Sequence, residues 1–123
     1  MKKKVAFIIG VSGQDGSYLA HYLIKKNFKV FGFTRSTAKI NLKNLYKLKV
    51  LNKINLIKYS ELKNESIEKK ILQLRPSQIY VLSGLSSVGK SFFLPIDAYR
   101  SNISTLFKIL EICRKKKLPI KIY

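Results

Sequence analysis

The sequence predicts an α/β fold, in which a parallel sheet of about five strands is flanked by helices. Three observations predict it. A short apolar run, Lys4 to Ile9, precedes a glycine-rich turn and an amphipathic stretch that begins at Ser17. A second apolar run, Lys29 to Thr34, follows that helix and completes a strand–helix–strand unit of about 30 residues. Gln78 to Leu82 is an almost continuous apolar run, as expected of a central parallel strand buried on both faces.

Length and composition are those of one domain with a sizeable core. The chain has 123 residues, of which 46% are hydrophobic, so we expect a single domain over residues 1–123. A single cysteine, Cys113, excludes an intrachain disulfide, and a single histidine, His21, excludes a His-rich metal site. No window approaches the ~20 apolar residues of a membrane span, and the first apolar run lacks a signal-peptide cleavage pattern. We therefore expect a cytoplasmic protein without a metal or a membrane segment.

The formal net charge of +19 has two interpretations. It could attract polyanions such as nucleic acid or an anionic membrane, or it could be a solvated lysine-rich surface. The lysines are dispersed along the chain, and only Lys2–Lys4 and Arg114–Lys117 form runs. The second run falls where a helix should end, and cations there complement the helix dipole. Dispersion favours the solvated surface, so nucleic-acid binding is not expected, although a basic binding module stays an alternative.

The first turn has the residues of a phosphate-binding loop. Gly10 suits a tight turn, Gly13 lets a diphosphate approach bare backbone, and Gly16 lets the helix pack close to the strand. The helix N-terminus then directs N–H groups at the phosphates. The spacing G-x-x-G-x-x-G also fits a plain strand-to-helix turn. The predicted cofactor-binding residues of this turn are Gly10, Ser12, Gly13, Gln14, Asp15 and Gly16.

The string Gly-Gln-Asp-Gly-Ser-Tyr-Leu at residues 13–19 resembles the extended short-chain dehydrogenase/reductases, and within them the GDP-mannose 4,6-dehydratase family. Most relatives carry an apolar pair where this chain has Gln14-Asp15. The resemblance implies a Rossmann-type fold, an NADP cofactor, a homo-oligomer and a role in nucleotide-sugar metabolism toward GDP-fucose. The implied reaction converts GDP-mannose into GDP-4-keto-6-deoxymannose and water, through oxidation at C4, loss of water across C5–C6 and reduction at C6.

The end of the second strand bears on cofactor choice. A free ribose 2′-hydroxyl is met by an acid at this position and a 2′-phosphate by a cation. Here Arg35 and Ser36 stand at the position, which favours NADP over NAD, and the alternative is an exposed arginine in a very basic chain. After a loop and a short helix within residues 36–54, Asn55 to Tyr59 is the third expected strand. The family then has Gly-Asp-Leu, whose Asp contacts adenine, where this chain has Ser60, Glu61 and Leu62.

The expected helix from Glu65 to Leu74 leads to the strand Gln78–Leu82 and a loop with two interpretations. Residues 84–91 match G-x-x-x-x-G-K-S, which predicts a P-loop nucleotide hydrolase with Lys90 on the terminal phosphates. Pro95 argues against this because it would interrupt the helix that must follow, and no later strand supplies the magnesium-binding Asp. Residues 80–91 also align without a gap with the dehydratase pattern. There Leu82, Ser83, Gly84 and Ser86 are expected beside the cofactor, while Leu85 and Ser87 replace Gln and His on the substrate side.

The last elements are an expected helix from Asp97 to Lys117 and a fifth strand from Leu118 to Tyr123. The helix should bury a stripe of apolar residues, with Cys113 as a small core residue rather than a nucleophile. The predicted inward residues are Tyr99, Ile103, Leu106, Phe107, Leu110 and Cys113.

Family members continue from the fifth strand into a Ser/Thr loop and a Tyr-x-x-x-Lys helix, which carry proton transfer. We therefore expect this chain to be truncated before that helix and to hold no catalytic residue. The expected function is that of the NADP-binding portion of a dehydratase acting on a GDP-mannose-type nucleotide sugar, inactive on its own. Another NADP-dependent sugar-nucleotide epimerase or reductase is the nearest alternative.

Overall fold

The computed structural model describes residues 2–59, 65–83 and 103–123. They form one five-stranded parallel sheet in the order β3-β2-β1-β4-β5. This order confirms the expected fold, because it is that of a Rossmann-type sheet whose strand order reverses between β1 and β4. The described strands are β1 Val5–Ile9, β2 Lys29–Thr34, β3 Asn55–Lys58, β4 Gln78–Val81 and β5 Lys121–Ile122.

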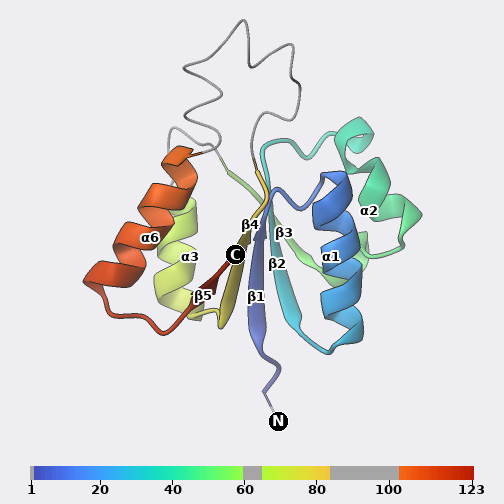
Figure 1. Cartoon of the computed structure of the whole chain (residues 1–123). Coiled ribbons are helices and arrows are strands. Elements are labelled where there is room, and N and C mark those ends of the chain that lie inside the picture. Colours follow the sequence, from blue (N-terminus) through green and yellow to red (C-terminus); the bar gives the residue numbers. More distant parts are fainter. Residues whose placement is uncertain (1, 60–64, 84–102) are drawn as a thin grey trace, which may run out of the picture.

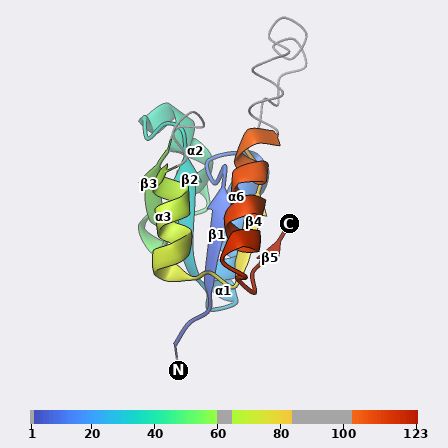
Figure 2. The same cartoon turned by 90° about the vertical axis from the view of Figure 1, so that its left-hand side faces the viewer.

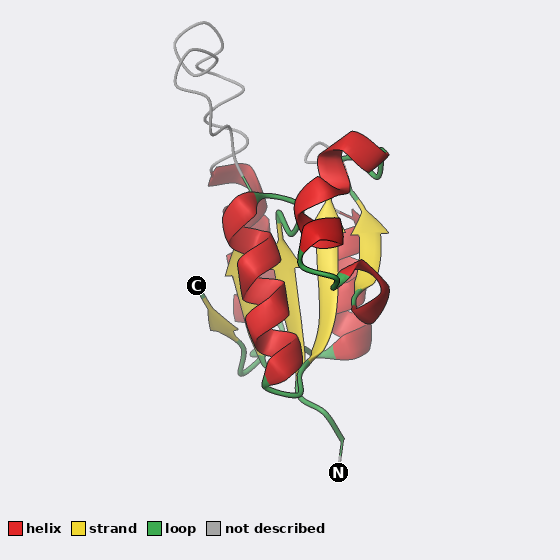
Figure 3. Ribbon diagram, turned by 90° about the vertical axis from the view of Figure 1, so that its right-hand side faces the viewer, coloured by secondary structure: helices red, strands yellow, loops and turns green. Residues whose placement is uncertain are grey.

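Helices cover both faces of the sheet, as Figure 1 shows. Figure 3 looks onto the face covered by α1 and α2, and Figure 2 onto the face covered by α3 and α6. The described helices are α1 Gln14–Lys25, α2 Lys43–Lys47, α3 Glu65–Leu74 and α6 Thr105–Lys115, with the 3₁₀ segments η1 Lys39–Leu42 and η2 Leu51–Lys53 around α2. None of the helices in the described ranges is long and apolar enough to cross a membrane.

Two hydrophobic cores lie on the two sides of the sheet, and β1 supplies both. Its alternate residues Phe7 and Ile9 pack with Ile71 and Ile109 beneath α3 and α6, whereas Ala6 and Ile8 pack beneath α1 and α2. All four β1 side chains are fully buried. A strand that is apolar on both faces is the pattern expected at the centre of a parallel sheet. The apolar run that opens the sequence is therefore the middle of the molecule.

The helix α6 turns a different face to the sheet than the sequence suggested. Thr105, Ile109 and Cys113 are buried, while Phe107 and Leu110 are 62% and 44% exposed. The prediction that Phe107 and Leu110 point inward is therefore wrong. The three buried residues are spaced four apart and form one face of the helix. The first of them is a polar threonine, so a search for apolar residues alone does not find this face. Tyr99 lies outside the described residues.

The fifth strand is shorter than the expected Leu118–Tyr123. The strand β5 is Lys121–Ile122, which pair with Gln78 and Ile79 of β4, and Tyr123 continues the backbone hydrogen bonds to Ile79 and Val81, both at 2.9 Å, so the strand is shorter mainly at its start. The reason lies just before Lys121: Pro119 has no N–H to donate, and the buried Leu118 closes the core under α6. The other described strand bounds lie within one residue of those read from the sequence.

Cys113 offers a test of the packing of α6. The side chain is buried, and burial raises the pKa of its thiol. Because the thiolate is the reactive form, we expect a disulfide reagent at pH 8 to label native Cys113 about 100-fold more slowly than the urea-unfolded chain. The rate of thiol release in the two states measures this. Similar rates in both would contradict the buried position of Cys113 and the packing of α6.

Candidate nucleotide-binding site

A cavity of about 580 Å³ lies at the edge of the sheet where the strands end. It is formed by the turn between β1 and α1, the end of β2 with the loop that follows, Tyr59 after β3, and the end of β4. This is the point at which the strand order reverses, and ligands of open parallel sheets bind there. The volume is in the range of small-molecule and cofactor sites.

The turn leaves no room for side chains at two of its glycines. Gly10 has a φ of +92°, and an added Cβ would lie 2.8 Å from the backbone nitrogen of Ser83. An added Cβ at Gly16 would overlap the carbonyl oxygen of Gly10 and lie 2.8 Å from the Cα of Val11. Backbone atoms cannot yield as flexible side chains can. The first and third glycines therefore permit close contacts between β4, the turn and α1.

Gly13 differs, because its missing side chain leaves open space. The nearest atom to an added Cβ is the carbonyl oxygen of Gly10, at 3.6 Å. Gly13 is also the N-cap of α1 and has no side-chain oxygen with which to accept from the first N–H groups of the helix. These N–H groups, with the positive end of the helix dipole, therefore face the cavity as donors for an anion.

A buried serine holds the turn in this shape. The hydroxyl of Ser17 donates to the carbonyl oxygens of Val11 at 3.0 Å and Gly13 at 2.7 Å. The N–H groups of Gly10 and Val11 both donate to the carbonyl oxygen of Phe33, at 2.8 and 3.2 Å, which ties the turn to β2. The turn is thus fixed before any ligand arrives, which reduces the ordering cost of binding.

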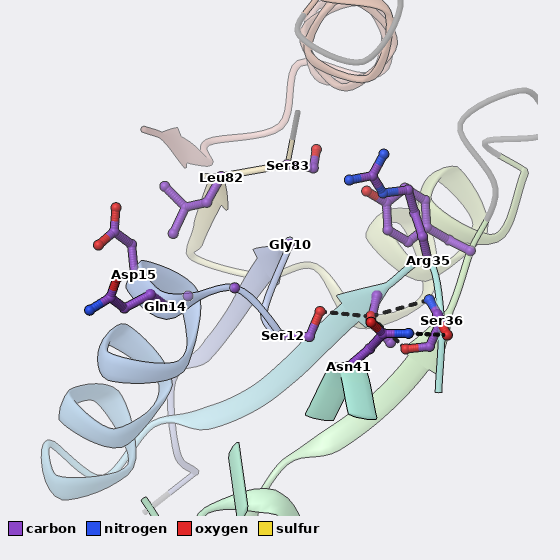
Figure 4. Close-up of a pocket in the computed structure, with 13 residues that line it drawn as sticks. Gly10, Ser12, Gln14, Asp15, Arg35, Ser36, Asn41, Leu82 and Ser83 are labelled. Carbon is purple, nitrogen blue, oxygen red and sulfur yellow. Dashed lines mark hydrogen bonds between the residues drawn. The ribbon is translucent and has the colours of Figure 1, made fainter. Parts of the chain in front are cut away.

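Hydrogen bonds link the glycine turn to the loop after β2. The hydroxyls of Ser12 and Thr34 lie 3.0 Å apart, and Thr34 Oγ1 donates to the carbonyl oxygen of Ser36 at 2.9 Å. Asn41 Nδ2 donates to Ser36 Oγ at 2.9 Å. Figure 4 shows this chain of contacts beside the cavity, with Arg35 above it. Arg35 is exposed, so its guanidinium gives this end of the cavity a positive charge.

The structure gathers most of the predicted site residues around one cavity. The cavity is lined by Gly10, Ser12, Gly13, Gln14, Asp15, Gly16, Arg35, Ser36, Leu82 and Ser83. Glu61, Leu62, Gly84 and Ser86 lie outside the described residues, as does the P-loop-like segment 84–91. In the part of the chain that is described, no three His, Cys, Asp or Glu residues are grouped to hold a metal ion.

The cavity is also lined by three residues that were not predicted from the sequence: Thr34, Asn41 and Tyr59. Thr34 ends β2 and Tyr59 directly follows β3. Both could have been found, because residues at the carboxyl ends of neighbouring parallel strands meet at the binding crevice. Asn41 lies in η1, a segment without a sequence signal, and is held beside the cavity by hydrogen bonds to Ser36 and Ala38.

Tyrosine–lysine pairs four residues apart do occur in the chain, at Tyr22–Lys26 and Tyr59–Lys63. Tyr22 is 55% exposed near the end of α1, and the Nζ of Lys26 lies 5.6 Å from the centre of its ring. This cation–π pair is at the opposite end of the helix from the cavity, more than two turns away. It therefore takes no part in the site. Lys63 lies outside the described residues.

Solved structures confirm the fold. The chain is similar to the UDP-glucose 4-epimerase of Thermus thermophilus, with a TM-score of 0.75 and 18% identity over 93% of this chain and 35% of that one. The UDP-glucose 4-epimerase of Brucella ovis gives a TM-score of 0.74 and 15% identity, over 94% and 33% of the two chains. At these identities the similarity shows the arrangement of strands and helices alone.

Sequence comparisons identify the family. The sequence model of GDP-mannose 4,6 dehydratase matches residues 7–123. The GDP-mannose 4,6-dehydratase of Vibrio cholerae serotype O1 is 35% identical over 121 residues, covering 93% of this chain and 32% of the relative. The human enzyme is 36% identical over 98 residues, covering 75% and 26%. The chain thus spans about a third or less of the length of these curated relatives, and it belongs to the GDP-mannose 4,6-dehydratase family.

Proposed function

We propose that this chain binds NADP in the cavity and is the cofactor-binding part of a dehydratase that acts on GDP-mannose. The observation that carries the proposal is the glycine turn, in which two glycines exclude any side chain and the third opens the helix N-terminus to the cavity. Such an arrangement suits a dinucleotide diphosphate. The epimerase structures of Thermus thermophilus and Brucella ovis contain NAD, which supports a nicotinamide dinucleotide.

The lining residues suggest how the dinucleotide would lie. The diphosphate would sit over Gly13 and accept hydrogen bonds from the first turn of α1. The adenosine end would extend toward Arg35, Ser36 and Asn41, and the nicotinamide end toward Leu82 and Ser83. When bound, the nicotinamide supplies a site that accepts and returns a hydride.

Arg35 is the reason to propose NADP rather than NAD. A guanidinium donates paired hydrogen bonds to phosphate, and Ser36 offers a hydroxyl next to it. The Asn41 amide, which already donates to Ser36 Oγ, fixes that hydroxyl at the same end of the cavity. These groups match a 2′-phosphate, and the carboxylate among the described lining residues, that of Asp15, lies at the α1 side of the cavity rather than beside Arg35.

The substrate assignment rests on the relatives, which are named GDP-mannose 4,6-dehydratases. Since the chain spans about a third of their length, we propose that it binds cofactor without converting GDP-mannose by itself. The described residues at the cavity supply positioning groups for a dinucleotide, and no catalytic role is proposed for any of them.

A titration of the 123-residue chain with NADPH, NADH and magnesium-ATP tests this function, using the intrinsic fluorescence of the reduced nucleotides and calorimetry. We expect NADPH to bind most tightly and Gly13→Val to weaken it more than tenfold, since the new side chain occupies the open space that the diphosphate needs. Circular dichroism of the variant provides the folding control. Magnesium-ATP binding that exceeds NADPH binding and survives Gly13→Val would overturn the proposal in favour of the segment 84–91.

A further inference from the structure

The fold gathers lysines that are dispersed in the sequence onto the edge of the sheet where the strands begin, opposite the nucleotide cavity. The N–H of Lys29 donates to the carbonyl of Lys4, Ser77 to Val5, and Lys121 to Ser77, which places the starts of β1, β2, β4 and β5 side by side. Figure 1 shows this edge with the N-terminus below the sheet. The amino-edge surface consists of Lys2, Lys3, Lys4, Lys25, Lys26, Lys29, Lys53, Arg75, Lys116, Lys117 and Lys121, all of which are exposed.

The segments of the described chain that form this surface carry no acidic residue to balance it. The segments that form it, residues 2–4, 25–29, 48–54, 75–78 and 115–121, contain neither Asp nor Glu. Among the described acids, Asp15 lies in the first turn of α1 and Glu65 and Glu68 in the first turn of α3, at the opposite ends of those helices, and Glu111 pairs with Arg114 on the side of α6. The positive potential of the edge is therefore not cancelled by local ion pairs.

Cations stabilise helix C-termini, but this effect explains only part of the positive charge of the amino-edge surface. The C-termini of α1, α3 and α6 all point to this edge, and each carries about half a negative charge. The cations of the surface exceed that sum several-fold. In addition, Arg75 and Lys117 have φ values of +47° and +51°, at turn positions where glycine has the lowest conformational cost. The chain thus carries cations at two left-handed positions of this edge.

We propose that the amino-edge surface binds the phosphate backbone of nucleic acid without regard to sequence. A nucleic acid fits better than a lipid bilayer for two reasons. Tyr22, whose ring lies beside Lys26, is an exposed aromatic side chain at this surface and can stack on a base, whereas Ile40 and Phe107 lie elsewhere, so the surface lacks an aliphatic patch to insert into lipid. The arm of Lys2–Lys4 also projects from the edge, as Figures 2 and 3 show, so the surface is not flat.

The binding of a labelled single strand of about 20 nucleotides, followed by fluorescence anisotropy between about 50 and 300 mM salt, tests the proposal. The variant Lys26→Gln/Lys53→Gln/Lys116→Gln removes three charges from the amino-edge surface. Its matched control, Lys39→Gln/Lys43→Gln/Lys58→Gln, removes three exposed charges from segments outside that surface. We expect the first variant to bind at least tenfold more weakly at about 100 mM salt, with a salt slope smaller by about 2, and the control to change less than threefold.

Three outcomes would overturn the proposal. Equal losses in the two variants would mean that net charge alone attracts the strand. Binding to vesicles containing phosphatidylserine at a salt concentration that abolishes oligonucleotide binding would assign the surface to membranes. Competition by NADPH would place the strand in the nucleotide cavity instead.

Two controls accompany these measurements. Unchanged thermal melting of both variants shows that they are folded. Binding of NADPH by each variant is measured separately, so failure of the nucleotide-site proposal is distinguished from failure of this one.

Discussion

Gly16→Ala is expected to lower the free energy of unfolding by about 3 kcal/mol, although glycine-to-alanine changes inside helices usually stabilise by about 1 kcal/mol. The new Cβ would overlap the carbonyl oxygen of Gly10 and approach the Cα of Val11 to 2.8 Å. Both atoms belong to a turn that is tied to β2 and to Ser17 by hydrogen bonds, so it cannot move away freely. Because the steric term exceeds the helix-propensity gain, the sign of the change is itself diagnostic.

Urea unfolding and thermal melting measure this effect, which corresponds to a fall in the melting temperature of about 10 °C. The matched control is Gly13→Ala, three residues earlier, where an added Cβ meets only one atom, at 3.6 Å. We expect this control to lose about 1 kcal/mol of stability at most, the usual difference between glycine and alanine at an N-cap, and to lose NADPH affinity, since its methyl group faces the phosphate position. A Gly16→Ala variant as stable as the parent chain would show that α1 does not approach the turn this closely.

Local patterns predicted the sheet correctly, and they selected residues that the structure brings together around one cavity, for a physical reason. A buried parallel strand must be apolar on both faces, and a phosphate-binding turn must be free of side chains. These two requirements restrict the residue types within residues 4–16 so strongly that the pattern is recognisable from the sequence. Given the observed strand order, right-handed connections place α1 and α3 on opposite faces of the sheet. The glycine turn, Arg35 and Ser83 line one cavity in the resulting fold.

The features that the sequence did not reveal depend on contacts between distant segments. The buried face of α6 includes Thr105, which is polar, and excludes Phe107, which is apolar. Asn41 lies at the cavity, where its amide donates to Ser36 Oγ and its N–H to the carbonyl oxygen of Ala38. The lysines of the amino-edge surface are far apart in the chain, and the fold alone brings them together. Periodicity within one segment carries no information on any of these.

Arg35→Asp is expected to reverse the cofactor preference. The change replaces a donor to the 2′-phosphate with a like charge, and a charge-assisted hydrogen bond contributes about 1.5–3 kcal/mol, so NADPH should bind about 100-fold more weakly. An Asp at the end of β2 can instead accept from a free 2′-hydroxyl, so NADH affinity should stay equal or rise. Titrations of both nucleotides at one salt concentration give the ratio of the two dissociation constants.

Lys39→Asp is the control for the change in net charge. It makes the same charge change as Arg35→Asp at an exposed residue that does not line the cavity. We expect this control to alter NADPH affinity less than threefold, because charges exposed to solvent are screened by salt. Arg35→Lys should fall between the two, since it keeps the charge and loses the paired donors of the guanidinium. If Arg35→Asp leaves the NADPH-to-NADH ratio unchanged while Gly13→Ala still weakens both nucleotides, the cavity binds a dinucleotide whose 2′ position is recognised elsewhere.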